Sequence, residues 1–375
     1  MKICIISSLY DPYSKGGVET AVKNITSAYA NKGYEVIIIT TGPYIGLKSL
    51  LPHKTVMDDM SVFRFYPLNI FWFFNIDSKP FWLRCFWHLI DTFNIHGCFV
   101  VRQILKQEKP DIVLTHGLKG ISGLIPILLK ILKRKHIHTV HDIQLIIPSG
   151  ILIAGEEDGF KHNNTLINAY RLWARFSFSF IKTVIFPSKW LLDFYTQYGF
   201  FKQSNKLVLQ NPIMIRQDSN THTEKDNSVF NFIYIGQIET HKGILLLIDA
   251  FMEIYKNDKN KKIFLHIVGD GSDMNRLINA TKDCNNIIIH GRKTNSEAMN
   301  LLTQAHLCIV PSLCYENAPM IITESINMRI PILASSIGGI PEMIQNHRAG
   351  FLFKTNNKTD LIEKMQYCLD HKLNS

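Results

Sequence analysis

The sequence predicts an α/β fold made of two Rossmann-like domains, each with a parallel sheet. Three observations support this prediction. Short runs rich in Val and Ile alternate with amphipathic segments along the chain, which is typical of parallel strands covered by helices on both faces. A polar stretch at 217–228 interrupts the alternation. Glycine-containing turns follow the first predicted strand on either side of that stretch.

The first half of the chain starts with a buried strand at 2–8 and a helix that Gly16 and Gly17 open and Gly33 ends. Glycine is common just past the end of a helix because it adopts positive φ without a steric penalty. The further strands predicted in this half are 35–41, 111–115, 136–140, 184–187 and 206–209.

The second half repeats this pattern after 217–228, which we interpret as an exposed loop at the domain boundary. Its predicted strands are 230–237, 264–269, 287–290, 307–310 and 332–335. We place one domain at 1–212 and a second at 213–355, with 356–375 as a helical segment that closes the chain. Ligands of such sheets bind at the carboxyl ends of the strands, so two facing sheets would share one interdomain cleft.

The formal net charge of +10 leaves three classes of partner open: nucleic acid, an anionic membrane surface and an anionic small substrate. The basic residues are spread along the chain, with the densest runs at 130–138 and 256–262. Neither run belongs to a known nucleic-acid-binding motif. We therefore expect no nucleic-acid partner.

The seven cysteines are scattered and include no CxxC pair. This pattern favours a reducing cytoplasm and argues against a cysteine metal site. The first residues are a poor signal peptide, and no apolar run reaches 18 residues. The acidic residues form no convincing metal cluster either. We expect a cytoplasmic protein that does not span the membrane and holds no metal.

An aromatic-rich segment raises the question of membrane contact. Residues 70–74 (IFWFF) and 81–87 (FWLRCFW) are strongly apolar, and Lys79, Arg84 and His88 lie among them. Such a segment can lie in the interface of an anionic membrane. It can equally form part of the aromatic core of the first domain, and both interpretations stay open at this point.

Two glycine turns are candidate phosphate sites. Gly16 and Gly17 lie between a strand and a helix, and a helix N-terminus offers free N–H groups and a partial positive charge. In the second half Gln237 ends a strand and Lys242 precedes a helix, where a lysine can place its charge on a diphosphate. The alternatives are a plain strand-to-helix turn and an ordinary surface lysine.

Glu316 and Glu324 are the candidate carboxylates. Pro319 is placed to start a helix, so Glu324 falls in its second turn. Eight helical residues would separate the two glutamates by about 12 Å, whereas the carboxylate pairs of glycosidases lie about 5 to 9.5 Å apart. The spacing better suits two hydroxyl-bearing groups of a long ligand. A capping glutamate followed by a solvated helix face is the alternative.

Two histidines end neighbouring predicted strands. His116 follows 111–115, and the pair His141 and Asp142 follows 136–140. Carboxyl ends of parallel strands are where such sheets bind ligands. A single histidine at a strand end is more often structural, but two on adjacent strand ends favour a site.

Five segments together carry a resemblance to a family: KGGVET, YIGQIETHKG, VGDG, PSLCYENAPMIITES and RIPILASSIGGIPEMI. In this order they resemble the family-4 glycosyltransferases, which are retaining enzymes of the GT-B fold. The resemblance covers most of the chain and is weakest at 47–99. The most specific part is Glu316 and Glu324 with the GGIPE that follows them.

The resemblance implies roles for individual residues. The donor sugar and ribose would be held by Glu316, Asn317, Ala318, Pro319, Met320 and Glu324. The diphosphate would meet Gly16, Gly17, Gln237 and Lys242, and the base would lie near Arg292. The family often has arginine where this chain has Gln237, so one charge on the leaving phosphate is given up. His116 would contact the donor sugar and transition state, with His141 and Asp142 on the acceptor side.

The expected activity is therefore transfer of a hexose or related sugar, with retention, from a nucleotide-diphosphate donor to a glycan or lipid-linked acceptor. By the resemblance, the first domain would hold the acceptor and the second the donor, without a metal or other cofactor. The process would be surface polysaccharide or glycolipid synthesis. An anionic membrane surface stays open as a further partner. Two alternatives stay open: a GT-B sugar-nucleotide epimerase, and a non-catalytic nucleotide-sugar-binding protein, which Gln237 favours.

Overall fold

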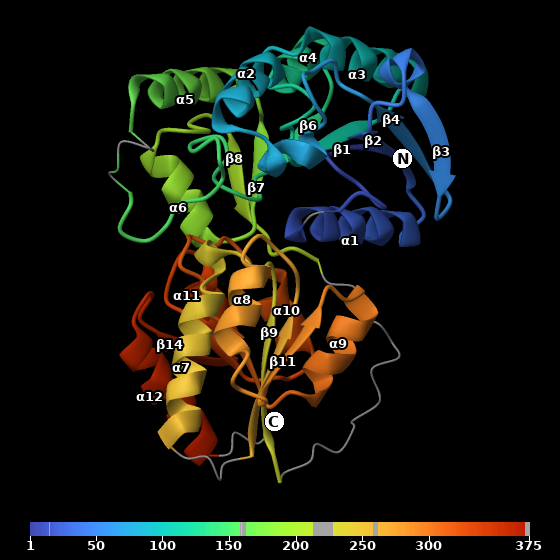
Figure 1. Ribbon diagram of the computed structural model, residues 1–375. Helices are drawn as coiled ribbons and strands as arrows, with labels where there is room; N and C mark the ends of the chain where they lie inside the picture. Colours follow the sequence, from blue (N-terminus) through green and yellow to red (C-terminus); the bar gives the residue numbers. More distant parts are fainter. Residues whose placement is uncertain (15, 158, 160–162, 213–227, 258–261, 372–375) are drawn as a thin grey trace. The chain divides into compact units, whose positions relative to one another are not determined.

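The computed structural model describes residues 1–14, 16–157, 159, 163–212, 228–257 and 262–371 (Figure 1). The chain forms two compact units. Unit 1 comprises Met1–Gly150 and Asn163–Pro212, and unit 2 comprises Ile151–His162 and Ile213–Ser375. The loop predicted at 217–228 lies outside the described residues except for Ser228. Each unit is described by itself.

Unit 1 is built on an eight-stranded sheet with the order β3-β4-β2-β1-β5-β6-β7-β8. Every pairing is parallel except that of β3 with β4, which are antiparallel. The strands are β1 Lys2–Ile6, β2 Glu35–Thr41, β3 His53–Met57, β4 Met60–Phe65, β5 Ile112–Thr115, β6 His136–Thr139, β7 Thr183–Phe186 and β8 Asn205–Val208. The β3–β4 hairpin lies where the sequence pattern was least informative and was not predicted.

The helices of unit 1 lie on both sides of its sheet, with α2 to α5 forming a layer opposite α1 (Figure 1). They are α1 Gly17–Asn31, α2 Phe81–Thr92, α3 Ile95–Glu108, α4 Ile125–Ile131, α5 Thr165–Phe178 and α6 Lys189–Gln197, with short 3-10 helices η1 Leu47–Leu50 and η2 Phe73–Ser78. The central strands β1 and β2 are buried almost throughout, as a parallel sheet covered on both faces requires.

Unit 2 is built on a six-stranded, all-parallel sheet with the order β11-β10-β9-β12-β13-β14. The strands are β9 Phe230–Ile235, β10 Ile263–Val268, β11 Ile287–Gly291, β12 Leu307–Val310, β13 Ile332–Ser335 and β14 Gly350–Phe353. Its helices are α7 Ile244–Asn257, α8 Met274–Thr281, α9 Asn295–Gln304, α10 Met320–Asn327, α11 Ile340–His347 and α12 Lys358–Asp370, with η3 Thr240–Lys242. The sequence pattern did not reveal β14.

Alternate residues of β9 enter two core clusters, one on each face of the unit 2 sheet. Phe232 packs with α7, α8 and α12, and Ile233 packs with α9, α10 and α11. The last helix, α12, buries Leu361 in the first of these clusters and pairs Lys358 with Glu253 of α7 at 2.8 Å. It is therefore part of the unit 2 core, whereas the sequence pattern predicts 356–375 as a separate closing segment.

Residues 151–162 belong to unit 2, although the predicted boundary places them in the first domain. Ile153 forms an antiparallel bridge with Cys314, and the N–H of Tyr315 donates to the carbonyl of Leu152 at 2.8 Å. The Tyr315 hydroxyl also donates to Glu157 at 2.8 Å. These hydrogen bonds satisfy backbone groups of a segment that has no strand or helix pattern of its own, which is why the sequence did not reveal them.

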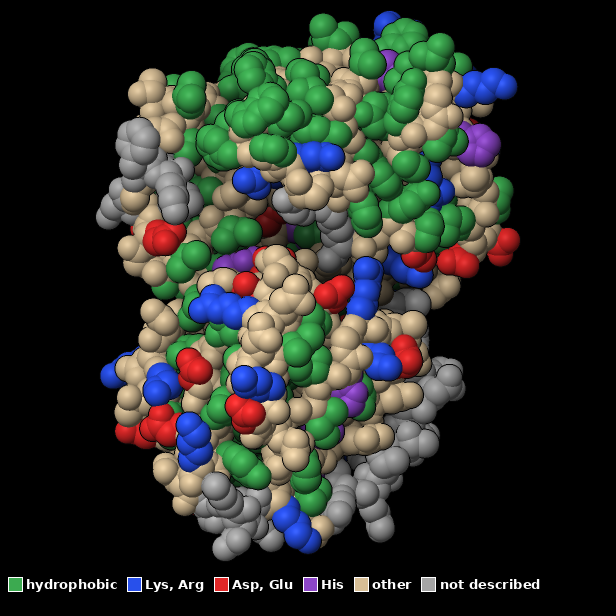
Figure 2. Space-filling view, viewed as in Figure 1, with side chains coloured by type: hydrophobic (Ala, Val, Ile, Leu, Met, Phe, Trp, Pro, Cys, Tyr) green, Lys and Arg blue, Asp and Glu red, His purple; other side chains and the backbone are tan. Residues whose placement is uncertain are grey.

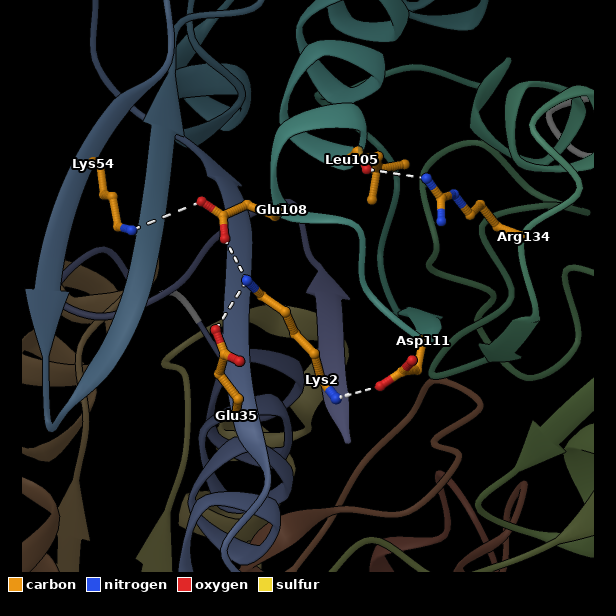
Figure 3. Close-up of polar contacts among 7 residues, drawn as sticks. All are labelled: Lys2, Glu35, Lys54, Leu105, Glu108, Asp111 and Arg134. Atoms are coloured by element: carbon orange, nitrogen blue, oxygen red, sulfur yellow. Dashed lines mark hydrogen bonds and ion pairs between the residues drawn. The ribbon is translucent and has the colours of Figure 1, made fainter.

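An ion-pair cluster holds the amino ends of the central strands of unit 1 together (Figure 3). The ammonium of Lys2 lies 2.6 Å from Glu108 and 2.9 Å from Glu35, and Lys54 lies 3.7 Å from the same Glu108 carboxylate. The N–H of Lys2 also donates to Asp111. Since ligands of parallel sheets bind at the opposite, carboxyl ends, we assign this cluster a structural role.

Candidate active-site residues

In unit 2 the loop after β9 and the loop after β12 are in direct contact. Gly243 has φ of +73°, and a Cβ at this position would lie only 1.9 Å from the carbonyl oxygen of Pro311. Leu313 donates its N–H to the carbonyl of His241 at 2.9 Å. Only glycine allows this approach, and it brings the residue before it, Lys242, against the loop that carries Glu316.

Lys242 and Glu316 form an ion pair with Nζ 2.5 Å from Oε1. The same Oε1 accepts a hydrogen bond from the Ser312 hydroxyl at 3.3 Å. Burial by itself would lower the pKa of Lys242, but the Glu316 carboxylate outweighs it, so the pKa is raised. Lys242 is therefore a fixed positive charge at neutral pH. Burial also raises the pKa of the Cys314 thiol beside the pair to about 12.

The backbone of Glu316 is held by the two glycines that precede α11. Gly338 has φ of +61°, and a Cβ there would lie 2.1 Å from the carbonyl oxygen of Glu316. The N–H of Gly339 donates to that same carbonyl at 2.8 Å. The GGIPE segment thus acts on Glu316 directly, a contact that the motif in the sequence does not reveal.

Glu324 lies in the second turn of α10, as predicted, with Pro319 immediately before the helix. Burial raises the pKa of its carboxyl group, and Asn295 donates to Oε1 at 3.4 Å. Asn317 is about nine-tenths buried. Sequence reasoning missed Asn295. Gln237 and Arg292, proposed for the diphosphate and the base, are both exposed, and the Gln237 carbonyl accepts a hydrogen bond from Tyr234 at 2.6 Å.

In unit 1, Gly16 caps α1 and Gly17 is its first residue, and both are exposed. The Gly16 N–H donates to the Glu19 carboxylate at 2.9 Å. Glutamate three residues after the cap is the spacing of a capping box, so the sequence held this signal. An anionic ligand at this helix end would have to replace Glu19 on that N–H.

His116 and His141 are brought together at the carboxyl ends of β5 and β6. Their Nδ1 and Nε2 atoms are 2.8 Å apart, and His116 is 2% exposed. Burial, and secondarily the neighbouring histidines, hold the pKa of His116 well below its usual range. Burial lowers the pKa of His141 to about 4. Both rings are neutral at pH 7, so they can exchange hydrogen bonds with hydroxyls but carry no charge.

The same strand ends open into a cavity of about 80 Å³ within unit 1. Asp142 lines it, and its Oδ1 accepts the N–H of Gln144 at 2.8 Å. Burial raises the pKa of Asp142. The lining also includes Asp91, Lys119 and Tyr170, which sequence reasoning missed because they lie in segments of different helices and loops with no shared motif.

The predicted site residues thus fall into two sets. The structure brings Lys242 to Glu316 in unit 2, and His116 to His141 in unit 1. Across the described residues, no group of three or more His, Cys, Asp or Glu side chains is arranged to hold a metal ion. In that same part of the chain, no helix is both long and apolar enough to cross a bilayer.

Two family models cover almost the whole chain. The model described as "Glycosyltransferase Family 4" matches residues 15–214, which is more than half of it. The chain belongs to the family-4 glycosyltransferases. The model described as "Glycosyl transferases group 1" matches residues 216–374 of this glycosyltransferase. The predicted family is thereby confirmed, and with it the transferase class.

Solved structures confirm the GT-B fold. Sucrose-phosphate synthase from Thermosynechococcus elongatus aligns with a TM-score of 0.74 over 98% of this glycosyltransferase and 90% of that chain, at 15% identity. HepE from Anabaena, in complex with UDP, aligns with a TM-score of 0.68 over 100% and 91%, at 16% identity. In sequence, an uncharacterized 42.6 kDa protein of the cps region of Klebsiella pneumoniae is 23% identical over 92% of this chain and 87% of its own.

Proposed function

We propose that this glycosyltransferase moves a hexose or related sugar, with retention of configuration, from a nucleotide-diphosphate sugar to a glycan or lipid-linked acceptor. The observation that carries the proposal is the Lys242–Glu316 pair, which places a fixed cation beside a carboxylate in unit 2, where the family resemblance puts the donor. HepE, which shares the fold, is described in complexes with UDP and with UDP-glucose. The cps-region relative supports a process in surface polysaccharide synthesis.

The mechanism follows from charge. Breaking the sugar–phosphate bond builds negative charge on the leaving diphosphate and positive character on the sugar ring. Lys242 stabilises the diphosphate. As the diphosphate takes up the Lys242 cation, the Glu316 carboxylate becomes available to the sugar hydroxyls. Glu324 binds the ribose.

Attack occurs on the face that the diphosphate leaves, and the departing phosphate accepts the acceptor proton, so the configuration is retained. The neutral His116 ring accepts a hydrogen bond from a donor hydroxyl, and the backbone carbonyl of His116 stabilises the positive charge that develops on the sugar. His141 and Asp142 shape the acceptor side.

The reaction needs no divalent metal, because Lys242 and backbone N–H groups stabilise the negative charge of the diphosphate that a metal would otherwise neutralise. Activity should survive EDTA. Complete loss of activity on chelation, restored by Mg²⁺ or Mn²⁺, contradicts this part of the proposal.

The deciding experiment incubates the protein with a panel of UDP-, GDP- and dTDP-sugars and glycan or glycolipid acceptors. The product linkage is then read by NMR. Transfer with the anomeric configuration of the donor supports the proposal. A free epimerised sugar nucleotide would support an epimerase, and binding without transfer or donor hydrolysis would support a non-catalytic protein.

We also propose that the protein acts at the inner face of the cytoplasmic membrane. Phe81, Trp82 and Phe86 of α2 are each more than half exposed, so this helix is not simply an aromatic core segment. Trp87, by contrast, is buried. Flotation with vesicles that contain anionic lipid should carry the protein upward, and full activity without any vesicle binding would refute this location.

A further inference from the structure

Two helices of unit 1 each have one face on the cavity and an exposed apolar face. On α2, His88, Asp91 and Thr92 line the cavity. The opposite side of α2 carries an apolar stripe at helical spacing, which ends at the C-cap residue Phe93. Its side chains are 47–61% exposed: Trp82, Phe86, Leu89 and Phe93. Figure 2 shows apolar side chains gathered over the layer of α2 to α5.

The second helix, α5, repeats this arrangement beside α2. Tyr170, Trp173 and Ala174 line the cavity, whereas Leu172 and Phe176 are more than half exposed. The rings of Phe93 and Trp173 are 4.8 Å apart, which joins the two helices at the cavity wall. The cavity is thus roofed by two helices that present apolar side chains outward, an arrangement that marks an interaction surface.

The cavity is largely apolar, and the few polar groups that line it do not suit an anion. Asp91 and Asp142 line it together with Lys119, and the carboxyl Oδ1 of Asp91 is held by the N–H of Gly120 at 2.9 Å. Two carboxyl groups disfavour a phosphate, and neutral imidazoles favour groups that both donate and accept hydrogen bonds. Burial lowers the pKa of His88 to about 3, so this ring is uncharged. A hydroxyl-bearing, uncharged group is the ligand that matches these walls.

Two residues that line the cavity, His116 and Trp173, each have a buried ring nitrogen without a hydrogen-bond partner in the described part of the chain. Nε2 of His116 is buried and has no hydrogen-bond partner among the residues that the structure describes. A buried polar atom left in this state is costly, so a water or the donor-sugar hydroxyl proposed for His116 is expected on it. The volume of about 80 Å³ exceeds the roughly 10–15 Å³ that one water needs, which leaves room for the edge of a sugar ring.

Basic side chains lie on the outer layer beside the apolar ones. On α3, Ile95 and Phe99 continue into Arg102 and Lys106 on one exposed stripe, since these residues are three or four apart. Lys79 lies just before α2, within 5.8 Å of the Phe71 ring. Apolar side chains flanked by cations match the interface of an anionic bilayer.

We propose that the cavity under α2 and α5 binds the terminal sugar of a glycolipid acceptor, while the outer faces of these helices lie in the anionic bilayer that carries the lipid. This inference rests on the proposed transferase function and names the class of its acceptor. Asp91 and Tyr170 are the residues assigned to the sugar hydroxyls.

The test compares two acceptors of the same sugar: a monohexosyl diacylglycerol in vesicles of phosphatidylcholine and phosphatidylglycerol, and the methyl hexoside in solution. A small panel of hexoses is used for both. The readout is the ratio of transfer to donor hydrolysis, measured in the same sample. This ratio is independent of the folded fraction, so a poorly folding variant still reports. Donor hydrolysis by the wild type without acceptor tests the proposed function separately.

We expect the wild type to transfer at least tenfold more efficiently to the vesicle-borne lipid. Asp91→Asn and Tyr170→Phe should each lower the transfer-to-hydrolysis ratio about tenfold on both acceptors, the scale of one lost hydrogen bond to a charged or buried partner. Phe86→Ser with Phe176→Ser should lower the ratio selectively on the vesicle-borne lipid. The matched control is Ile278→Ser, which removes a half-exposed apolar side chain from unit 2.

Equal efficiency of the wild type on the two acceptors would overturn the proposal and assign a soluble glycan to the cavity. An unchanged ratio in both Asp91→Asn and Tyr170→Phe would remove these residues from the acceptor site. A loss in Ile278→Ser as large as in the double variant would show that general apolar exposure, and not this surface, is responsible. Absence of both hydrolysis and transfer in the wild type would instead refute the transferase function.

Discussion

Lys242 and Glu316 lie 74 residues apart in the chain, and in unit 2 their ammonium and carboxylate groups are 2.5 Å apart. Each is therefore occupied by the other when no donor is bound. A diphosphate competes with Glu316 for the lysine, and the sugar hydroxyls compete with Lys242 for the glutamate. Donor binding exchanges one ion pair for two ligand contacts.

Replacing Lys242 should damage catalysis more than binding. Lys242→Ala should lower kcat by about 10²- to 10³-fold, the scale of losing one preorganised charge-stabilising group, because the cation acts most strongly on the charge of the leaving diphosphate. Steady-state kinetics with saturating donor measure it. Lys282→Ala removes an exposed lysine of the same unit and serves as the control. Equal kcat in the two variants would remove Lys242 from the mechanism.

The two glutamates should separate in their kinetic effects. Glu324→Ala should raise the donor KM about tenfold with little change in kcat, because a ribose contact is the same in ground and transition states. Glu316→Ala should mainly lower kcat. The assignment fails if both single variants show wild-type kinetics.

His116 and its rival His141 can be distinguished by paired variants. His116→Ala should lower kcat/KM by about 10²-fold or more, the scale of one positioned catalytic group. Circular dichroism should show that the fold is intact. Near-normal turnover of folded His116→Ala together with an inactive His141→Ala would transfer the role to His141.

Gly338 offers a matched pair of glycine substitutions. Gly338→Ala forces a Cβ to within 2.1 Å of the Glu316 carbonyl, whereas Gly33→Ala has a similar positive φ and nothing within 4 Å. Both should lose about 1 kcal/mol or more of stability from backbone strain. Only Gly338→Ala should also lose activity, measured as kcat relative to the folded fraction. Equal activity would show that Gly338 does not position Glu316.

Stability of unit 1 should fall on acidification. Burial holds the pKa of His88 near 3 and that of His136 and His141 near 4, against an ordinary 6.5. Below about pH 6.5 the unfolded chain binds protons that the folded state does not bind. Each such histidine therefore lowers the free energy of unfolding by about 1.4 kcal/mol per pH unit, down to its folded pKa. All five tryptophans lie in unit 1, so urea unfolding followed by fluorescence at pH 5 and 7 measures it.

Asp91 should act in the opposite direction. Burial raises its pKa to about 7 from an ordinary 3.8, so its folded form binds a proton more tightly than the unfolded chain does. The stability it contributes is present at low pH and lost as pH rises through 7. Asp91→Asn should therefore stabilise unit 1 more at pH 8 than at pH 5, and a gain that is independent of pH would contradict the assignment.

The sequence by itself determined the alternation of strands and helices, because Val- and Ile-rich runs and helical periodicity depend only on neighbouring residues. It also located the helix starts at Gly16 and Gly17 and at Pro319, since the backbone preferences of glycine and proline are local. Glu324 lies in the helical turn predicted for it. The family motifs extend this local signal to the GT-B fold, which the solved structures confirm.

Only the tertiary structure decided which side chains meet. The contact of Gly338 with the Glu316 carbonyl, the His116–His141 hydrogen bond and the docking of 151–157 on unit 2 join residues that no spacing rule relates. Asp91 is the sharpest case. On the sequence it is one polar residue in an aromatic helix, and burial against the loop at Gly120 makes it part of a cavity. Desolvation and long-range packing depend on the whole fold, so they cannot be found in a local pattern.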